Sequence, residues 1–147
     1  MMLASAPRGI TREEAITNIV HGKILYLFVA MPPQLIPLDK YFVVVGLDEY
    51  PLLLKVNTKE KLIRNHLVLK QSIYSNFLKY NSYLDCDRVW YILSYEEIVG
   101  QLMSDPQKRI MGEILKDHAR IIVSKVNSSR SIAQRHKEII IKAFKAG

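Results

Sequence analysis

Two adjoining apolar runs constrain the fold more than any other feature of the chain. Residues 40–58 read KYFVVVGLDEYPLLLKVNT, and the tetrapeptide DEYP separates a run over 41–47 from a run over 52–56. The three consecutive valines are β-branched and suit a pleated strand better than a helix, so we predict an antiparallel hairpin here. Neither run alternates with polar residues. Both faces of the hairpin must therefore be covered, and we expect other strands on one face and helices on the other.

The remaining patterns predict a small α+β domain. Apolar spacing and capping patterns predict strands over 23–30, 66–70 and 81–93. They also predict helices over about 12–20, 94–103, 107 or 111 to 126, and 132–145, with one or two turns of helix or 3₁₀ over 72–79. Consecutive strands without long crossovers pair antiparallel. We therefore expect a strongly curved sheet or barrel of about five antiparallel strands, with an N-terminal helix and C-terminal helices packed outside it.

The composition is that of one folded domain. The chain has 147 residues, of which 49% are hydrophobic and 24% charged, and we expect a single domain over 1–147. Its barrel core should span about 22–93 and its helical C-terminal part 94–147. No run approaches the roughly 18 apolar residues of a membrane span, and the start, MMLASAPRGITREE, has no apolar core of signal-peptide length. We predict a cytoplasmic protein that does not contact a membrane.

No pattern points to a metal or cofactor site. Cys86 is the only cysteine, which excludes an internal disulfide and a cysteine-based zinc site. No neighbouring motif supplies a base to activate its thiol, so we predict a small core residue rather than a nucleophile. His118 and His136 lie on apolar helical stripes without acidic or thiol partners at ligand spacing. We therefore expect neither a metal nor a cofactor.

The positive charge gathers in the C-terminal third. The formal net charge is +7, and residues 104–147 hold ten lysines and arginines against four acidic residues. Such a surface suits a polyanion or an acidic partner protein. It equally suits a solvated helix surface that keeps the protein in solution.

Five short segments between residues 22 and 115 follow a recognisable order. They read GKILY at 22–26, KYFVVV at 40–45, KVNT at 55–58, SYLDCDRV at 82–89 and GEIL at 112–115. In this order they resemble the PemK/MazF family of toxin ribonucleases. The resemblance implies a compact SH3-like barrel, usually a homodimer, that cleaves single-stranded RNA such as mRNA without a metal. It also implies a cognate antitoxin protein, as in type II toxin–antitoxin systems.

The family's reaction gives roles to particular residues. The ribose 2′-hydroxyl attacks the adjacent phosphorus, which requires a proton acceptor, a cation facing the phosphorane and a donor for the leaving 5′-oxygen. By position, Lys40 corresponds to the family's basic residue and Thr58 to the hydroxyl that orients the phosphate or donates a proton. His66 would supply an imidazole to exchange the proton, if the preceding basic loop folds back over the site.

A second group of residues would hold the RNA. A basic stretch would follow the RNA backbone. A serine at the start of a later strand would also contact the RNA, as its position in the resemblance implies. These residues are Lys59, Lys61, Arg64, Lys70 and Ser82.

Each of these residues also has a purely structural interpretation. Lys40 can be an exposed charge at the start of a strand, and Thr58 can be an ordinary turn residue. Ser82 can be a strand-edge hydroxyl, and the basic stretch can be a solvated loop. The family has Arg-Pro where this chain has Lys40-Tyr41, and an ammonium lacks the bidentate grip of a guanidinium. This departure keeps a second hypothesis open, a non-catalytic barrel that binds a partner through the apolar stripes of its last two helices.

A third hypothesis is a DNA-binding regulator. The break near 126–131 would serve as the turn of a helix-turn-helix motif. However, the isoleucine run at 139–141 is too apolar for a helix that lies in a DNA groove.

Overall fold

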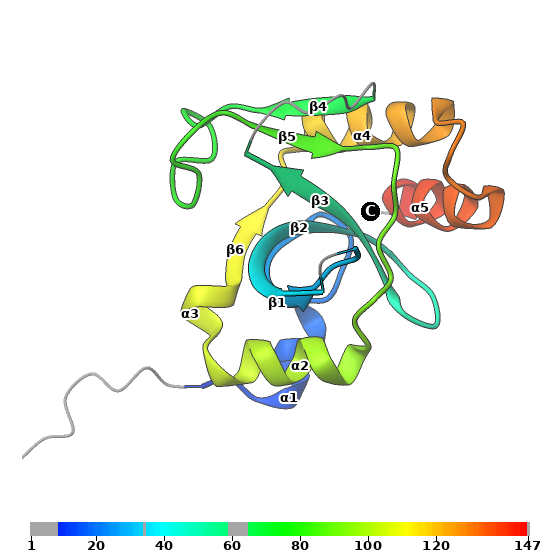
Figure 1. Ribbon diagram of the computed structural model, residues 1–147. Coiled ribbons are helices and arrows are strands. Elements are labelled where there is room, and N and C mark those ends of the chain that lie inside the picture. The colour runs from blue at the N-terminus through cyan, green and yellow to red at the C-terminus, as the bar shows by residue number, and fades with distance from the viewer. Residues whose placement is uncertain (1–8, 34, 59–64, 147) are drawn as a thin grey trace, which may run out of the picture.

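The computed structural model describes residues 9–33, 35–58 and 65–146, which form an α+β fold around one curled antiparallel sheet (Figure 1). The strand order is β4-β5-β3-β2-β1-β6. The strands are β1 (Lys23–Ala30), β2 (Pro37–Leu47), β3 (Pro51–Asn57), β4 (His66–Leu69), β5 (Ser82–Asp85) and β6 (Ile110–Glu113). The sheet is barrel-like, as expected, and the described residues contain six strands rather than about five.

The helices lie before β1, between β5 and β6, and after β6. They are α1 (Arg12–Thr17), α2 (Tyr95–Ser104), α3 (Pro106–Arg109), α4 (Lys116–Ser128) and α5 (Gln134–Ala146). Two of them begin with complete capping boxes, in which Thr11 pairs with Glu14 and Ser94 with Glu97. No helix in the described ranges has both the length and the apolar character needed to cross a bilayer.

The predicted hairpin is present and forms the middle of the sheet. β2 and β3 pair antiparallel, and their side chains alternate between two hydrophobic clusters. Val43 and Leu54 belong to the cluster beneath α4 and α5, which β4 and β5 also join, whereas Val44 and Leu53 belong to the cluster beneath α1 and α2. We expected strands to cover one face of the hairpin and helices to cover the other. Instead, helices cover both faces (Figure 1).

The helix predicted from about 107 or 111 to 126 begins only at Lys116, so both predicted starts are wrong. The chain forms the short α3, then β6, and only then α4. β6 pairs with the start of β1, with Gly112 opposite Ile24, and Gly112 has a φ of +119°. That backbone conformation is incompatible with a right-handed helix and is readily adopted only by glycine. Pairing with a distant strand thus overrides the helical spacing of the apolar residues.

The long strand predicted over 81–93 ends early. β5 stops at Asp85, whose Oδ1 accepts a hydrogen bond from the Asp87 backbone N–H at 2.8 Å. Such a side-chain bond replaces a bond of the strand ladder. The chain rejoins the sheet only at the Leu53–Trp90 bridge. The segment 72–79 forms two isolated turns, as predicted, with hydrogen bonds from the Tyr74 N–H to the Lys70 carbonyl and from the Leu78 N–H to the Tyr74 carbonyl.

The residues predicted to be inert take structural positions. Cys86 is fully buried. His118 is partly buried and its Nδ1 lies 2.7 Å from the Tyr74 hydroxyl, while the ring of His136 packs against Tyr91. Within the described residues, no three metal-ligating side chains come together.

Candidate functional site

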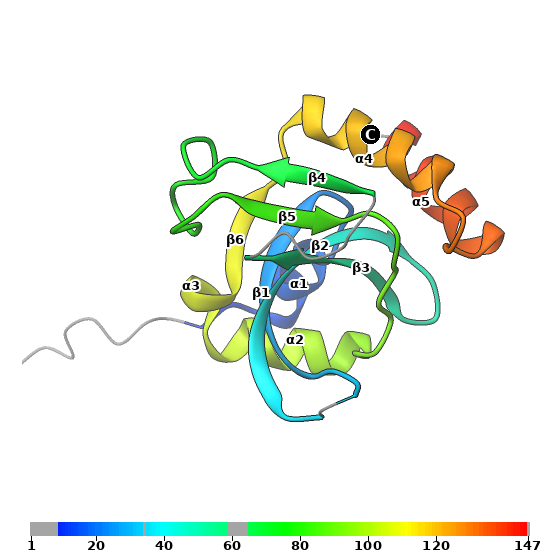
Figure 2. The same ribbon diagram turned by 45° about the horizontal axis from the view of Figure 1, so that its top comes forward.

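The two central strands separate at one end of the hairpin. β2 and β3 pair from Leu47–Pro51 as far as Phe42–Lys55. The next residues of β3, Val56 and Asn57, pair with β5 instead. Because β3 turns away toward β5, the first part of β2 is left without β3 as a neighbour (Figure 2). This divergence opens a wedge between the strands.

A cavity of about 430 Å³ occupies the wedge. Its lining combines two lysines, two tyrosines, a carboxylate, an amide and a hydroxyl with one aliphatic residue: Tyr26, Asp39, Lys40, Tyr41, Lys55, Val56, Asn57 and Thr58. Lys40 and Thr58, the two residues that the resemblance assigns to the phosphate, thus line the same cavity. Their proximity follows from the hairpin, which brings the start of β2 beside the end of β3.

Strand alternation brings the two lysines of the cavity to the same face of the sheet. Lys55 is registered with Phe42, two residues from Lys40 along β2. Alternate residues of a strand share a face, so Lys40 lies on the same face as Phe42 and its partner Lys55. Two ammonium groups on one side of a cavity form a site suited to an anion.

The same face continues across the two outer strands. The register pairs Asn57 with Tyr83 and His66 with Asp85. These side chains therefore point to the same side as the two lysines, and each is at most partly exposed. We use the name open sheet face for a set of partly exposed residues on four strands: Lys40, Lys55, Tyr83, Asp85 and His66.

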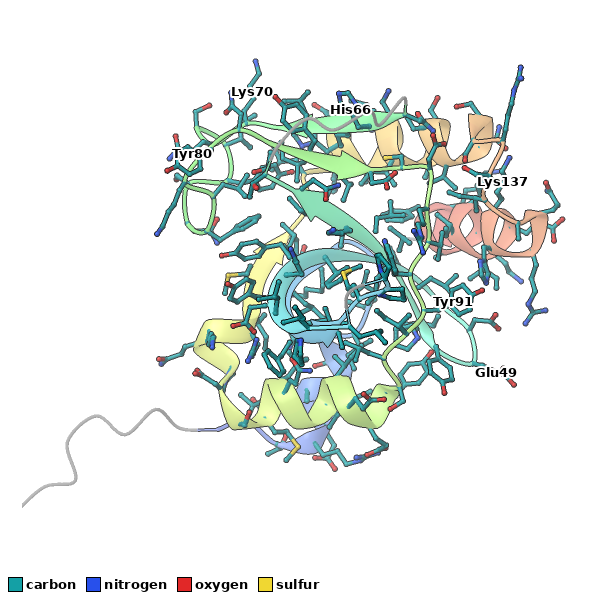
Figure 3. The ribbon with its side chains drawn as sticks, viewed as in Figure 1. Glu49, His66, Lys70, Tyr80, Tyr91 and Lys137 are labelled. Atoms are coloured by element: carbon teal, nitrogen blue, oxygen red, sulfur yellow. The ribbon has the colours of Figure 1, made fainter. Side chains whose placement is uncertain are left out.

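His66 lies on this face but does not line the cavity. It is on β4, separated from β3 by β5, and two strand spacings are about 10 Å. Its ring packs edge-on against Tyr83 with centroids 5.3 Å apart. Figure 3 shows His66 on the outer strand, with Lys70 beyond the end of that strand.

Asp85 lies between His66 and the cavity. Burial raises the pKa of its carboxyl group, while the hydrogen bond from the Asp87 backbone and the charges of Arg88 and Lys55 oppose that rise. A carboxylate with a raised pKa is better suited to accept a proton than an ordinary surface aspartate. The sequence alone did not identify Asp85 as a site residue, because its position beside Lys55 depends on the sheet topology.

The remaining predicted RNA contacts take different positions. Lys70 is exposed. Ser82 is buried and its hydroxyl donates to the Tyr80 carbonyl at 3.1 Å, as in the strand-hydroxyl interpretation. Lys59, Lys61 and Arg64 lie outside the described residues.

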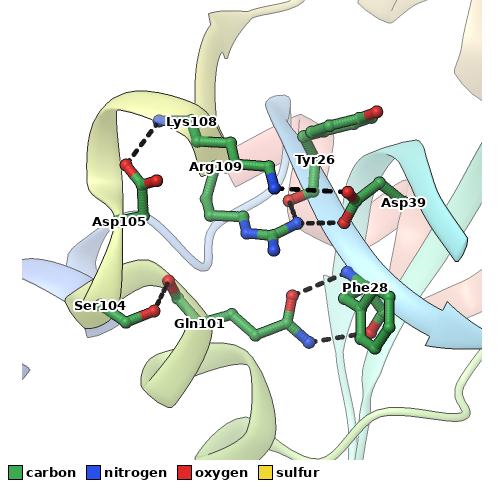
Figure 4. Close-up of polar contacts among 8 residues, drawn as sticks. All are labelled: Tyr26, Phe28, Asp39, Gln101, Ser104, Asp105, Lys108 and Arg109. Carbon is green, nitrogen blue, oxygen red and sulfur yellow. Dashed lines mark hydrogen bonds and ion pairs between the residues drawn. The ribbon is translucent and has the colours of Figure 1, made fainter. Parts of the chain in front are cut away.

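A salt-bridge network fixes the wall of the cavity formed by β1 and β2 (Figure 4). Arg109 Nη1 donates to Asp39 Oδ1 at 2.5 Å and to the Tyr26 carbonyl at 3.2 Å, and Lys108 Nζ lies 3.4 Å from Asp39 Oδ2. Burial would raise the pKa of Asp39, but the hydrogen bond and charge of Arg109, joined by those of Lys108, lower it overall. Asp39 is therefore a fixed anion in the lining of the cavity.

Aromatic rings extend this wall. The rings of Tyr26 and Tyr41 stack with centroids 4.2 Å apart, and Tyr41 contacts Phe77 at 4.9 Å. Burial raises the pKa of the Tyr41 hydroxyl, so this group stays protonated and can donate a hydrogen bond. It lies 3.4 Å from the Phe77 carbonyl.

In chemical terms, the wedge offers an anionic ligand two lysines, a hydroxyl and tyrosine edges, and its one carboxylate, Asp39, is paired with Arg109 and Lys108. No protein-family model matches this chain, and neither does any curated protein.

Proposed function

We propose that the protein is a metal-independent endoribonuclease that cleaves single-stranded RNA, with an SH3-like barrel of the PemK/MazF kind. The observation that carries the proposal is the joint presence of Lys40, Lys55 and Thr58 in the wedge cavity. A phosphate in this cavity would meet two cations and a hydroxyl group. That combination suits transfer at phosphorus without a metal.

The reaction would use these groups as follows. The ribose 2′-hydroxyl loses its proton and forms a bond to phosphorus, and the bond from phosphorus to the 5′-oxygen breaks, which leaves a 2′,3′-cyclic phosphate and a 5′-hydroxyl. Lys40 and Lys55 would stabilise the charge of the phosphorane. Thr58 would orient the phosphate or pass a proton to the leaving oxygen. An ammonium group has no lone pair with which to accept this proton, so the acceptor would be Asp85, which lies nearer the cavity than His66 on the same face.

The open sheet face would hold the RNA strand. Proteins bind single strands by combining cations that follow the backbone with aromatic rings that contact the bases. Here Lys40 and Lys55 would supply the cations, and Tyr83 with His66 would supply rings on the neighbouring strands. The basic C-terminal third adds a positive field that attracts polyanions.

RNA cleavage in EDTA tests the proposal. We expect the wild type to cleave a labelled single strand, and Lys40→Ala or Thr58→Ala to lower the rate by about a hundredfold, the effect of removing one transition-state donor. Lys142→Ala, which removes an exposed lysine of α5 outside the cavity, should leave the rate unchanged. Absence of cleavage by the wild type, or undiminished cleavage by both site variants, would exclude this function.

A non-catalytic interaction module is the second candidate. The sequence led us to expect that such a module would bind through the apolar stripes of its last two helices. That expectation is wrong, because these stripes pack against the sheet: Ile122, Val126 and Ile140 are fully buried. A different surface supports this candidate, however. The tip of the β1–β2 hairpin exposes apolar side chains, namely Phe28, Leu35, Ile36 and Leu38 at 48–64%. A homodimer or an antitoxin-like partner would bind at this tip.

The two candidates separate by experiment. If the tip is a dimer contact, Ile36→Asp should convert a dimer to a monomer in analytical ultracentrifugation. A ribonuclease toxin would also arrest growth of a bacterial host after induction, whereas the Lys40→Ala/Thr58→Ala variant would not. Growth without arrest, together with a partner-dependent change in sedimentation, would favour the interaction module.

A further inference from the structure

A second cavity of the described molecule lies away from the wedge. It has a volume of about 570 Å³ and shares no lining residue with the wedge cavity. This is within the size range of ligand clefts in proteins. Its walls come from the first two turns of α4 and the last turn of α5, with the segment before β1 and the end of β6 beside them. We refer to it as the helix groove.

The way in which α4 and α5 are joined accounts for the groove. Near their short connection the two helices are held together, because Lys137 Nζ donates to the carbonyls of Asn127 and Ser129. The groove lies at the other end of the pair, where Ala119 leaves room on α4 and Phe144 forms the opposite wall. The ring of Phe144 is fixed by an edge contact with His21, with centroids 5.0 Å apart.

The groove has an apolar floor and a cationic rim. Ile114, Ala119, Val123 and Phe144 provide the floor, and Lys116, Arg120 and Lys145 are exposed at the rim. The one carboxylate in the lining, Glu113, is paired with Lys23 at 3.0 Å. Arg120 also pairs with Asp117 on the same helix at 3.6 Å, a contact between two largely exposed side chains. With three cations against this one further carboxylate, the rim presents an excess of positive charge around an apolar depression.

The placement of the charges indicates the ligand. Lys116 and Arg120 are four residues apart on α4, which places them on one side of the groove about 5–6 Å from each other, and Lys145 lies on the other helix. Cations on both sides of the groove match several carboxylates spaced along a peptide better than they match the single head group of a lipid. An apolar floor favours a buried hydrophobic side chain over a phosphate backbone.

We propose that the helix groove binds an acidic segment of a partner protein, with a large apolar side chain on the floor and carboxylates against Lys116, Arg120 and Lys145. Charge complementarity and the apolar floor carry this assignment. It is independent of the ribonuclease proposal, because no residue of the wedge takes part.

Fluorescence anisotropy with designed peptides tests the groove. The probe is a fluorescein-labelled peptide of glutamate with leucine at i, i+3, i+4 and i+7. One control peptide carries glutamine in place of glutamate, and the other carries alanine in place of leucine. We expect the full chain to bind the probe more tightly than either control, because the groove needs both charge and an apolar anchor.

Matched variants locate the binding. Lys116→Glu/Arg120→Glu should weaken binding by about tenfold or more, and Ala119→Trp, which fills the floor without altering charge, should also weaken it. Arg130→Glu/Lys142→Glu makes the same charge change at exposed positions outside the groove and should alter binding less than about twofold. All these positions are partly or fully exposed, and circular dichroism would establish that each variant is folded.

Three results would overturn the proposal. One is equal binding of the glutamate and glutamine peptides. Another is an equal loss of binding in the two double variants, which would assign the effect to overall charge. The third is binding of single-stranded RNA or of vesicles containing phosphatidylglycerol that is lost in Lys116→Glu/Arg120→Glu while the peptide does not bind, which would make the ligand a different polyanion.

Discussion

Asp39 is the residue on which the wall of the wedge depends. Its carboxylate joins Arg109 and Lys108, and the side chains of Asp39 and Arg109 are only 24% and 12% exposed. Arg109 Nε already has no hydrogen-bond partner among the described residues. Asp39→Asn would leave the guanidinium largely buried without a counter-charge, and we expect it to lower the free energy of unfolding at pH 7 by about 2 kcal/mol.

The pH dependence of this effect follows from the sign of the pKa shift. The pKa of Asp39 is lower in the folded protein than its ordinary value of 3.8. The stabilisation is therefore present above that ordinary value and is lost as the pH falls through the lower, folded pKa. Urea unfolding followed by circular dichroism should show the gap between wild type and Asp39→Asn closing below about pH 4. A gap that stays constant to low pH would contradict this account. The exposed pair Arg12–Glu96 provides the control, since Glu96→Gln should have a far smaller effect at pH 7.

Lys55 is the residue that the structure adds to Lys40 and Thr58, the two residues expected to contact the phosphate. If the wedge binds RNA, Lys55→Ala should weaken binding of a single strand and reduce the slope of log K against log salt concentration by about 0.7, the value for one phosphate contact. Filter binding at several salt concentrations measures this slope, with Lys142→Ala as the matched lysine control. An unchanged slope would remove Lys55 from the RNA contacts.

At the residue scale, sequence reasoning reached only what lies within one hairpin. Lys40 and Thr58 could be paired because Lys40 lies in β2 and Thr58 directly follows β3, the next strand of the chain. Arg109 contacts Asp39 across 70 residues, and Asp85 reaches Lys55 only because β5 joins β3. Neither contact leaves a local signal in the sequence.

At the scale of elements, α5 rests directly on the central strand β2. A Cβ atom added to Gly46 would lie 3.0 Å from Ile139 Cγ2 and 3.7 Å from Ile140 Cγ1. Gly46→Val should push α5 away from the sheet and lower the free energy of unfolding by about 2 kcal/mol, as overpacking of a close-packed core does. Thermal and urea unfolding would measure the loss.

A second glycine supplies the contrasting control. Gly100 lies on the exposed side of α2, and a Cβ atom there would meet nothing within 4 Å. Gly100→Ala should therefore stabilise the protein by about 0.7 kcal/mol, because alanine loses less backbone entropy in a helix. Equal effects of the two glycine substitutions would contradict the close approach of α5 to β2.

Elements with strong local signals were predicted and the others were not. The capping boxes at Thr11 and Ser94 mark helix starts through contacts within four residues, and both are present. β6 depends on pairing with β1, almost ninety positions away along the chain, and the apolar spacing over 107–126 gives no sign of it. β5 ends where it does because the Asp87 N–H donates to the Asp85 side chain instead of to a neighbouring strand. Alternation of apolar and polar residues does not reveal this choice.

At the scale of the whole molecule, the sheet holds two helical layers together. β2 and β3 contribute alternate side chains to both hydrophobic clusters. Neither helical layer can therefore detach from the sheet without exposing buried residues of the central hairpin. The chain offers one probe for each layer. Cys86 is buried in the cluster beneath α4 and α5, and Trp90, the only tryptophan, is in the cluster beneath α1 and α2.

These probes allow a direct test of cooperativity. Burial raises the pKa of the Cys86 thiol to about 12, and the reactive species is the thiolate, so a disulfide reagent at pH 8 should label Cys86 only in molecules that unfold. Because the layers share β2 and β3, we expect the denaturant midpoint for Cys86 labelling to coincide with that for Trp90 fluorescence, as in two-state unfolding of a domain below about 150 residues. Labelling in high denaturant gives the reference rate for the unfolded chain. A labelling midpoint well below the fluorescence midpoint would show instead that α4 and α5 detach while the rest of the sheet stays folded.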